Sequence, residues 1–186
     1  FDDTLVPIGN DLSERNRAAI ARVRAAGVQF VIASGRTTYG LLYNARKNGI
    51  ETDGLYIIGY NGAQVTQAWD GKQLFAHPLD IELAQDAARV AAHFPVAIMV
   101  PEGADVFTNL PDDFSVGFET GANHTNPVLM TDFSHLEFAP SKLLFGGDRA
   151  ELERLATELR AQFSDVAEIM FSADFLLEFN AKGVTK

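Results

Sequence analysis

Amphipathic segments and almost entirely apolar segments alternate along the first third of the chain. The segment ERNRAAIARVRAAG at 14–27 places Ile20 and Val23 on one helical face, and Ser13 before it is a good helix N-cap. The run VQFVIA at 28–33 is short, rich in β-branched residues and nearly all apolar, which is typical of a strand covered on both faces. The pattern predicts a helix followed by a buried strand.

A second helix and a second buried strand follow this pair. The polar break SGRTT leads into a helical pattern at about 38–48, which Gly49 ends, and GLYIIGY at 54–60 is again a buried strand. Because strand, helix and strand are joined by short links, we expect a parallel sheet with a right-handed crossover. This order predicts an α/β protein with a Rossmann-like core.

The pattern changes after Asn61. The pair Asp70-Gly71 lies between strand-like flanks, which is a strong hairpin signal. Further along, hairpin-like strand pairs alternate with helices, and this favours an α+β unit with an antiparallel sheet. We expect helices at about 80–93 and 148–163, strand pairs within 95–110 and 166–180, a strand at 138–147, and irregular structure at 111–135.

The domain organisation follows from these two patterns. We find no internal repeat and no low-complexity linker, and the best boundaries lie near Asn61-Gly62 and near Asn180. The prediction is a core formed by 1–62 and 180–186 and an inserted α+β domain at 63–179. A core with only two clear strands would leave its sheet edges unpaired, so we expect it to be truncated at both ends.

Composition narrows the range of functions. With 25 acidic against 15 basic residues, the formal charge is −10, which argues against nucleic acid and against anionic membrane surfaces as partners. The absence of cysteine excludes disulfides, thiolate zinc sites and cysteine nucleophiles, and it fits a cytoplasmic location. No apolar run approaches the roughly 18–20 residues that span a bilayer, and no signal peptide is visible. Because the chain opens on Phe rather than Met, we expect its true N-terminus to be missing.

Two short stretches near the predicted strands carry candidate chemistry. FDDTLV at 1–6 opens with an acid pair before a Thr, and a surface turn would look the same. VIASGR at 31–36 is a buried strand that ends in a hydroxyl, a glycine and a cation, at the sheet edge where open α/β folds bind ligands. Ser34 can donate a hydrogen bond, and Gly35 lets backbone amides approach an anion closely. A plain strand-to-helix turn is the ordinary alternative.

Two further stretches have equally ordinary explanations when taken alone. YNGA at 60–63 follows the second strand, but Asn-Gly is common in tight turns. KGVTK at 182–186 ends in Lys186, a candidate counter-charge for phosphate, although a lone lysine is usually solvated.

Together, the four stretches resemble a known family. The order of the motifs is similar to that of the haloacid dehalogenase superfamily of phosphohydrolases. An acid pair with Thr comes first, SGR follows after about thirty residues and NGA after about twenty-five more, and an α+β insertion then precedes GVTK. The closest match is the Cof-type branch, in which a large cap (class IIB) is inserted between the second and third motifs. The resemblance spans the layout of the whole chain.

The resemblance assigns roles to the first motif. In the family pattern Asp-x-Asp-Gly-Thr, the nucleophilic aspartate lies four residues before the Thr, so with Thr4 in that place it falls just before Phe1. Asp2 then matches the general acid/base, whose backbone carbonyl also ligates Mg²⁺. Asp3 stands where glycine is usual and belongs to the phosphate-binding loop.

The other motifs supply the remaining expected site. Ser34 with Gly35 matches the phosphate ligand of the second motif, and Lys186 matches the third-motif lysine that neutralises the phosphoryl group. The fourth motif, which completes the magnesium site, should follow Lys186. The residues expected at the substrate cleft are Arg36, Asn61 and Gly62.

The implied activity is hydrolysis of small phosphorylated metabolites, such as sugar phosphates, through an aspartyl-phosphate with Mg²⁺ as cofactor. The alternatives are a phosphomutase of the same fold and a non-catalytic relative. The insertion is poor in Arg, which favours the hydrolase over a mutase that must hold a bisphosphate. The oligomeric state is not predicted.

Several residues in the insertion are open to two interpretations. Lys142 either faces the cleft or is a solvated charge at a strand end. Phe107, Phe114 and Phe118 fit a domain core better than a binding platform. The four histidines, which lack metal-ligand spacing, are expected to be ordinary residues of the insertion: His77, His93, His124 and His135.

Overall fold

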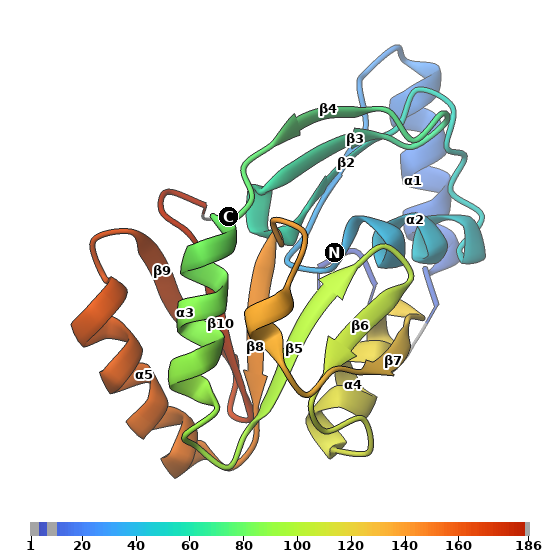
Figure 1. The fold of residues 1–186 in the computed structure, drawn as a ribbon. Helices are drawn as coiled ribbons and strands as arrows, with labels where there is room; N and C mark the ends of the chain where they lie inside the picture. The colour runs from blue at the N-terminus through green and yellow to red at the C-terminus, as the bar shows by residue number, and fades with distance from the viewer. Residues whose placement is uncertain (1–3, 7–10, 185–186) are drawn as a thin grey trace. The chain divides into compact units, whose positions relative to one another are not determined.

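The structure is a computed structural model that describes residues 4–6 and 11–184. Its chain packs into two compact units that divide between Ala76 and His77 (Figure 1). We call the part up to Ala76 unit 1 and the part from His77 unit 2, and each is described by itself.

Unit 1 begins with the predicted helix. Helix α1 spans Glu14–Ala25, and the hydroxyl oxygen of Ser13 accepts a hydrogen bond from the Asn16 amide at 3.2 Å. The N-cap expected from the sequence is therefore present. Gly27, just beyond the helix, has φ of +76°, a conformation that suits glycine at a helix end.

The predicted parallel pair forms around helix α2 (Thr38–Lys47). Strand β1 (Val31–Ala33) runs parallel to β2 (Tyr56–Gly59), with Val31 opposite Tyr56. Strand β1 is shorter than the predicted 28–33 because β2 starts at Tyr56 and offers no backbone partner to residues before Val31.

The hairpin around Asp70-Gly71 also forms, but it belongs to the first sheet. Strands β3 (Gln64–Gln67) and β4 (Gln73–Ala76) extend that sheet in the order β1-β2-β3-β4, and β3 pairs antiparallel with β2. The sequence boundary near Asn61-Gly62 placed this hairpin in the insertion. A short 3₁₀ turn (Tyr60–Gly62) reverses the chain so that β3 pairs with the strand just before it. Whether 63–179 acts as a cap remains a prediction.

The two faces of the unit 1 sheet differ in burial. Helices α1 and α2 contribute Ile20, Leu41 and Ala45 to a buried cluster that includes Ile32 and Ile57 of the sheet. The opposite face carries apolar side chains that stay partly open to solvent, among them Val31 at 40% and Phe75 at 51% exposure. The core of unit 1 therefore lies between one face of its sheet and the two helices.

Unit 2 is built on a six-stranded sheet in the order β7-β6-β5-β8-β10-β9. Its neighbouring strands are antiparallel except for β6 and β7, which are parallel, so the predicted α+β class with a mainly antiparallel sheet is confirmed. The strands are β5 (Ala97–Glu102), β6 (Asp105–Thr108), β7 (Asn126–Leu129), β8 (Lys142–Gly146), β9 (Ala167–Ala173) and β10 (Leu176–Ala181). The helices are α3 (Ile81–Ala91), α4 (Phe114–Asn123) and α5 (Arg149–Phe163).

The prediction of irregular structure at 111–135 is wrong. Helix α4, strand β7 and a 3₁₀ turn (Phe133–His135) occupy this stretch. Two glycines, Gly117 and Gly121, lie within α4, and its sequence FSVGFETGAN shows no continuous apolar stripe, so the periodicity that marks a helix is weak. Asp113 nevertheless caps α4, because its carboxylate accepts a hydrogen bond from the Ser115 amide at 2.8 Å.

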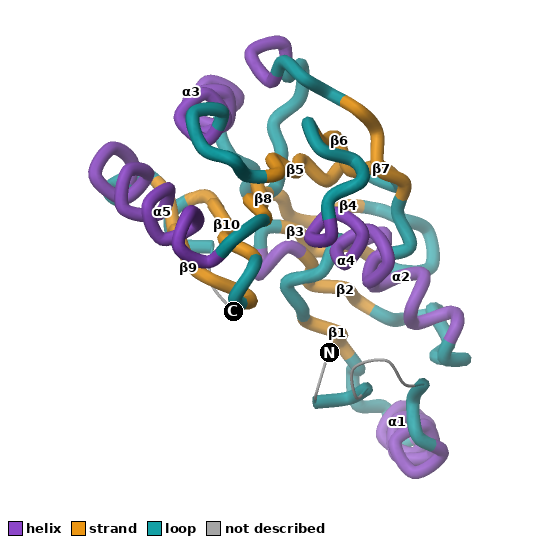
Figure 2. The backbone as a smooth tube through the Cα atoms, turned by 90° about the horizontal axis from the view of Figure 1, so that it is seen from below, coloured by secondary structure: helices purple, strands orange, loops and turns teal. Residues whose placement is uncertain are grey.

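The two faces of the unit 2 sheet are covered by different helices. Helices α3 and α5 lie side by side on one face, whereas α4 lies on the other (Figures 1 and 2). On the first face, Phe179 of β10 packs edge-on against Phe163 of α5, with ring centroids 5.8 Å apart. On the second, Val116 of α4 joins a buried cluster with Met99, Leu144 and others.

Candidate functional site

The carboxyl ends of β1 and β2 meet at one edge of the unit 1 sheet. The last register pair is Ala33 opposite Ile58, and the Ser34 amide then donates to the Ile58 carbonyl at 3.0 Å. Ser34 therefore stands directly beyond the strand end, at the edge where open α/β sheets place their ligands.

Backbone hydrogen bonds hold the second-motif loop against the segment that follows β2. The Asn61 amide donates to the Ser34 carbonyl at 3.2 Å, and the Tyr60 amide donates to the Arg36 carbonyl at 2.9 Å. Two stretches that are about twenty-five residues apart in the sequence are thus adjacent in space. Their roles as phosphate and substrate ligands stay predictions.

The loop from Ser34 to Thr37 is a tight turn. The hydroxyl oxygen of Ser34, only 6% exposed, accepts from the Arg36 amide at 3.3 Å. The buried hydroxyl of Thr37 then caps α2 by accepting from the Gly40 amide at 2.9 Å. The N-terminus of α2 consequently lies next to this loop, and the positive end of a helix dipole favours an anion there.

Backbone strain marks the same place. Tyr60 and Asn61 have φ of 50° and 58°, and both side chains are buried, at 3% and 4% exposure. A left-handed conformation costs a non-glycine residue about 1–2 kcal/mol, and Asn tolerates it better than Tyr does. Strain of this kind gathers at functional sites, where the surrounding structure imposes it. Sequence reasoning named Asn61 and missed Tyr60, because only the Asn-Gly pair carries a turn signal.

Three of the expected site residues, Asp2, Asp3 and Lys186, lie outside the described residues. Nearby, Val6 belongs to the buried cluster of unit 1, and the Leu5 carbonyl accepts from the side-chain amide of Asn16 at 2.9 Å. Among residues 4–6 and 11–184, no group of three His, Asp or Glu side chains is arranged to hold a metal. The magnesium ligand expected at Asp2 therefore rests on the resemblance alone.

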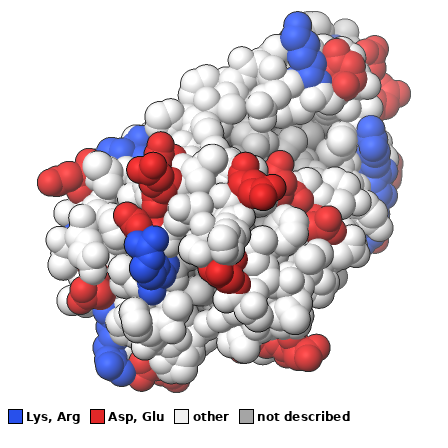
Figure 3. All heavy atoms as spheres, in the orientation of Figure 1, with Lys and Arg blue, Asp and Glu red and all other residues white. Residues whose placement is uncertain are grey.

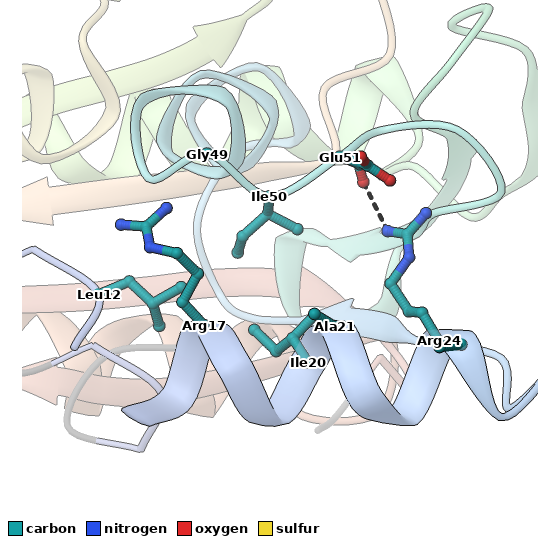
Figure 4. A pocket seen from close by; sticks show the side chains of 9 residues that line it. Leu12, Arg17, Ile20, Ala21, Arg24, Gly49, Ile50 and Glu51 are labelled. Carbon is teal, nitrogen blue, oxygen red and sulfur yellow. Dashed lines mark hydrogen bonds between the residues drawn. The ribbon is translucent and has the colours of Figure 1, made fainter. Parts of the chain in front are cut away.

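A separate cavity of about 480 Å³ lies between α1 and the segment that links α2 to β2 (Figure 4). The guanidinium of Arg24 donates to the Glu51 carbonyl at 2.6 Å, and Arg17 donates to the Asn48 carbonyl. Both arginines thus bind the backbone of this linking segment. These two hydrogen bonds hold α1 against the segment that links α2 to β2. Of the phosphate-site residues that the structure describes, Ser34 and Gly35, neither lines the cavity.

Lys142 is deeply buried, so its interpretation as a solvated strand-end charge is wrong. Its side chain is 2% exposed, and its Nζ lies 3.3 Å from Oε1 of Glu178, which is also buried. Sequence reasoning missed Glu178. A signal was available, since a charged residue in the apolar run FLLEF of a predicted strand is unusual unless it is paired.

The aromatic residues of α4 do not all belong to a core. Phe114 is 72% exposed and Phe118 43%, and both rings pack edge-on against Phe175 at 5.2 Å and 5.0 Å between centroids. Phe107, by contrast, is half-buried and packs against Phe138 at 5.8 Å. The expectation of a core position is therefore wrong for Phe114 and Phe118.

Charges are dispersed over the face of the molecule shown in Figure 3. Acidic and basic side chains alternate there with uncharged surface, and this face has no continuous basic patch. No helix among the described residues is long and apolar enough to cross a membrane.

Comparisons with known proteins agree with this layout. The sequence model of the haloacid dehalogenase-like hydrolase family matches residues 1–186. The chain is similar to a haloacid dehalogenase-like hydrolase from Bacteroides thetaiotaomicron, with 25% identity and a TM-score of 0.89 over 98% of this chain and 70% of that one. It is similar in fold to TM0651 from Thermotoga maritima, with 23% identity and a TM-score of 0.83 over 100% and 69% of the two chains. The HAD subclass IIB sugar phosphatase BT4131 shares the fold as well, with 16% identity and a TM-score of 0.74 over 100% and 70%.

Proposed function

Because this chain belongs to the haloacid dehalogenase-like hydrolases, of the Cof-type branch, we propose that it hydrolyses phosphomonoesters of small metabolites with the help of Mg²⁺. The members of this family are described as hydrolases, and one of the similar solved structures is a sugar phosphatase. The observation that carries the proposal is the pairing of two motifs at one sheet edge, where the Ser34–Arg36 loop is hydrogen-bonded to Tyr60 and Asn61.

The geometry of that edge suits a phosphoryl group. A buried hydroxyl at Ser34, the following glycine and the N-terminus of α2 offer hydrogen-bond donors and a positive helix end in one place. Lys186 would add a positive charge against the equatorial oxygens. Its position lies outside the described residues, so this part of the proposal rests on the motif order.

The proposed reaction has two displacements at phosphorus. The carboxylate of the aspartate expected before Phe1 attacks the phosphorus atom, an aspartyl-phosphate bond forms, and the bond to the ester oxygen breaks. Asp2, as the carboxylic acid, gives its proton to the departing alkoxide. Asp2 then accepts a proton from a water molecule that attacks the same phosphorus, the bond to the aspartate breaks, and inorganic phosphate leaves.

Mg²⁺, held in part by the backbone carbonyl of Asp2, would offset the negative charge shared by the phosphoryl oxygens and the attacking carboxylate. Its other ligands are expected from the aspartate proposed to lie before Phe1 and from the motif that should follow Lys186.

We further propose that residues 63–179 select the substrate as a cap on the core. Substitutions there should alter the ranking of substrates by kcat/KM, whereas changes at Asp2 or Ser34 should depress all substrates together. Equal losses on every substrate after changes in the cap would show that it has no part in selection.

The first experiment measures magnesium dependence with the full-length protein. Hydrolysis of p-nitrophenyl phosphate should require Mg²⁺, stop after exhaustive chelation and return when Mg²⁺ is added. Undiminished turnover after chelation would contradict the proposed function.

The second experiment tests the motif register. Asp2→Asn in the full-length protein should fold normally and lose roughly 10²-fold or more in turnover, the usual scale for lost acid/base help. Near wild-type turnover in a folded variant would show that the register is wrong. If, in addition, the residue before Phe1 is not Asp, the alternative of a non-catalytic relative would be favoured.

A further inference from the structure

The cavity beside α1 is framed by two arginines and has an apolar floor. Arg17 and Arg24 are seven residues apart on α1, so they lie on the same side of the helix and about 10 Å apart along its axis. Ile20 and Ile50 lie between them (Figure 4). Further apolar residues of the lining are Leu12, Ala21 and Ala25. We call this space the α1 cavity. Its volume of about 480 Å³ is within the usual range for small-molecule sites.

The fold holds the Arg17 guanidinium at the wall of the α1 cavity. This group donates to the carbonyl of Asn48, the residue that ends α2. Gly49, which follows, has φ of +66°, and a Cβ atom there would lie 2.5 Å from the Arg17 Nη1 atom. The position of Arg17 therefore depends on a glycine at 49, since a side chain would occupy the place of the guanidinium.

Arg17 also has hydrogen-bond donors that a ligand can use. A guanidinium carries five N–H donors, and the Asn48 carbonyl takes one of them. The Nε atom lies 3.5 Å from a carboxylate oxygen of Glu14, whose side chain is 88% exposed. An ion pair so open to water contributes little, because water solvates both charges. A ligand carboxylate can therefore replace Glu14 as the partner of Arg17 at little cost.

Arg24 is held more firmly at the other end of the α1 cavity. Its guanidinium donates to two carbonyls of the linking segment, those of Glu51 at 2.6 Å and of Asp53. These carbonyls are acceptors and cannot bind an anion themselves. Arg24 thus mainly adds positive charge to the site, and Arg17 is the group that can bind a ligand directly.

The sequence around the α1 cavity carries a charge opposite to that of the rest of the chain. Residues 11–53 contain seven of the 15 basic residues and four of the 25 acidic ones, a net charge of +3. The rest of the chain contains eight basic and 21 acidic residues, a net charge of −13. This region therefore attracts anions although the chain as a whole is acidic.

The lining favours a carboxylate with an apolar body over a phosphate. A carboxylate pairs with a guanidinium through two parallel hydrogen bonds, and one such partner suits a single negative charge. A phosphate has further oxygens that need donors, and the apolar side chains between the two arginines offer none. The same side chains favour a hydrocarbon group, which leaves water when it covers them.

We propose that the α1 cavity binds a small carboxylic acid with an apolar body, as its carboxylate. The carboxylate pairs with Arg17, and the apolar body covers Ile20 and Ile50. This site is separate from the Ser34 loop, and its ligand does not depend on the proposed phosphatase function. Within α1, which the structure describes in full, Ile20 alone is buried. A ligand that binds only the folded form should therefore also hold α1 more firmly.

The test measures binding to the full-length protein and not turnover. Hexanoate is the probe, acetate has the same charge without the apolar body, and 1-hexanol has the hydrocarbon chain without the charge. Calorimetric titration should show saturable binding of hexanoate and binding at least about tenfold weaker for the other two compounds. Hexanoate should also slow hydrogen exchange at α1 amides.

Two variants locate the site. Ala21→Phe fills the α1 cavity and Arg17→Gln removes the charge, and each should weaken hexanoate binding by about tenfold or more. Arg15→Gln is the matched control, because Arg15 is exposed on the same helix and does not line the cavity. It should leave the affinity for hexanoate within about twofold. If Arg17→Gln does not fold, Ala21→Phe carries the test, since Ala21 is exposed and a larger side chain fits there.

Three outcomes would overturn the inference. Hexanoate may show no saturable binding, the two variants may bind it as well as the control does, or acetate or 1-hexanol may bind as tightly as hexanoate. Each of these results would leave the phosphatase proposal standing, because no step of the test measures hydrolysis. In the same way, a protein without phosphatase activity could still bind hexanoate at this site.

Discussion

The two faces of the unit 2 sheet pack against their helices with different kinds of side chain. The face toward α3 and α5 carries fully buried apolar side chains such as Phe145 and Phe179. The buried residues of α5 include Leu152, Leu155 and Leu159. Against α4, only part of the face is apolar, and the rest holds buried charges and amides.

The two faces therefore differ in how much they contribute to the stability of unit 2. Burial of a large apolar side chain contributes about 1.5–3 kcal/mol, so the α3/α5 face is a main source of stability for unit 2. The α4 face contributes less per residue, and an element with few buried apolar contacts opens more easily. We expect α5 to behave as scaffold and α4 as the more adaptable element.

The largest expected effect comes from a cavity on the α3/α5 face. Phe145→Ala should destabilise the protein by about 3–5 kcal/mol, because the side chain is fully buried. Phe114→Ala changes the same residue type at 72% exposure and should stay within about 0.5 kcal/mol. Chemical denaturation measures both, and similar losses for the two variants would contradict the contrast between the faces.

Overpacking tests how closely α4 approaches the sheet. A Cβ atom added at Gly146 would lie 1.9 Å from the Ser115 hydroxyl oxygen and 2.4 Å from its Cβ, so Gly146→Ala should cost about 1–3 kcal/mol. Adding Ser115→Gly removes both clashing atoms and should recover part of that loss in thermal unfolding. If the double variant were as unstable as the sum of the single changes, the contact between Gly146 and Ser115 would not be the cause.

Loss of the helix cap tests the adaptability of α4. Asp113→Ala should cost about 1 kcal/mol and speed hydrogen exchange mainly at α4 amides, because the carboxylate accepts from the Ser115 amide. Asp148→Ala removes the corresponding cap of α5, which accepts from the Ala150 amide at 2.9 Å. That variant should leave hydrogen exchange slow in the middle of α5. If exchange there were faster than in α4 of the Asp113→Ala variant, α4 would not be the helix that opens more easily.

The smallest change that we expect across ordinary pH is in the stability that the charge of Lys142 contributes. Burial acts to lower the pKa of Lys142, but the charges of Glu178 and Glu119 outweigh it, and the pKa in the folded protein is raised. The stability that this charge contributes is therefore present below the unfolded pKa, about 10.4, and is lost only as pH rises through the folded value. The difference in free energy of unfolding between wild type and Lys142→Met should be constant between about pH 8 and 9.5 and narrow above about 10.5. The exposed Lys72→Met is the control. A difference that already narrows below pH 9 would show that Lys142 is not held charged by Glu178 and Glu119.

Several elements could be predicted because their determinants are local. The cap at Ser13, the glycine after α1 and the Asp70-Gly71 turn act over a few residues, and the parallel β1–β2 pair follows from two apolar runs joined through a helix. The segments around Ser34 and Asn61 could be expected at one edge for the same reason, since parallel strands end together.

Other features depended on contacts between distant parts of the chain. The hairpin at 64–76 joined the first sheet because β3 found a partner in β2, and the positive φ of Tyr60 comes from that reversal and not from its own preference. Helix α4 escaped prediction because it turns polar residues inward, which no apolar periodicity reveals.

The sequence by itself determined the order of the motifs, the alternation of helix and strand and the local caps and turns, because each of these depends on residues close together in the chain. Only the tertiary structure decided that Lys142 is buried beside Glu178. These residues lie 36 positions apart on two strands whose pairing depends on the whole sheet. Burial and charge pairing are properties of the assembled sheet and helix, so no short stretch of sequence contains them.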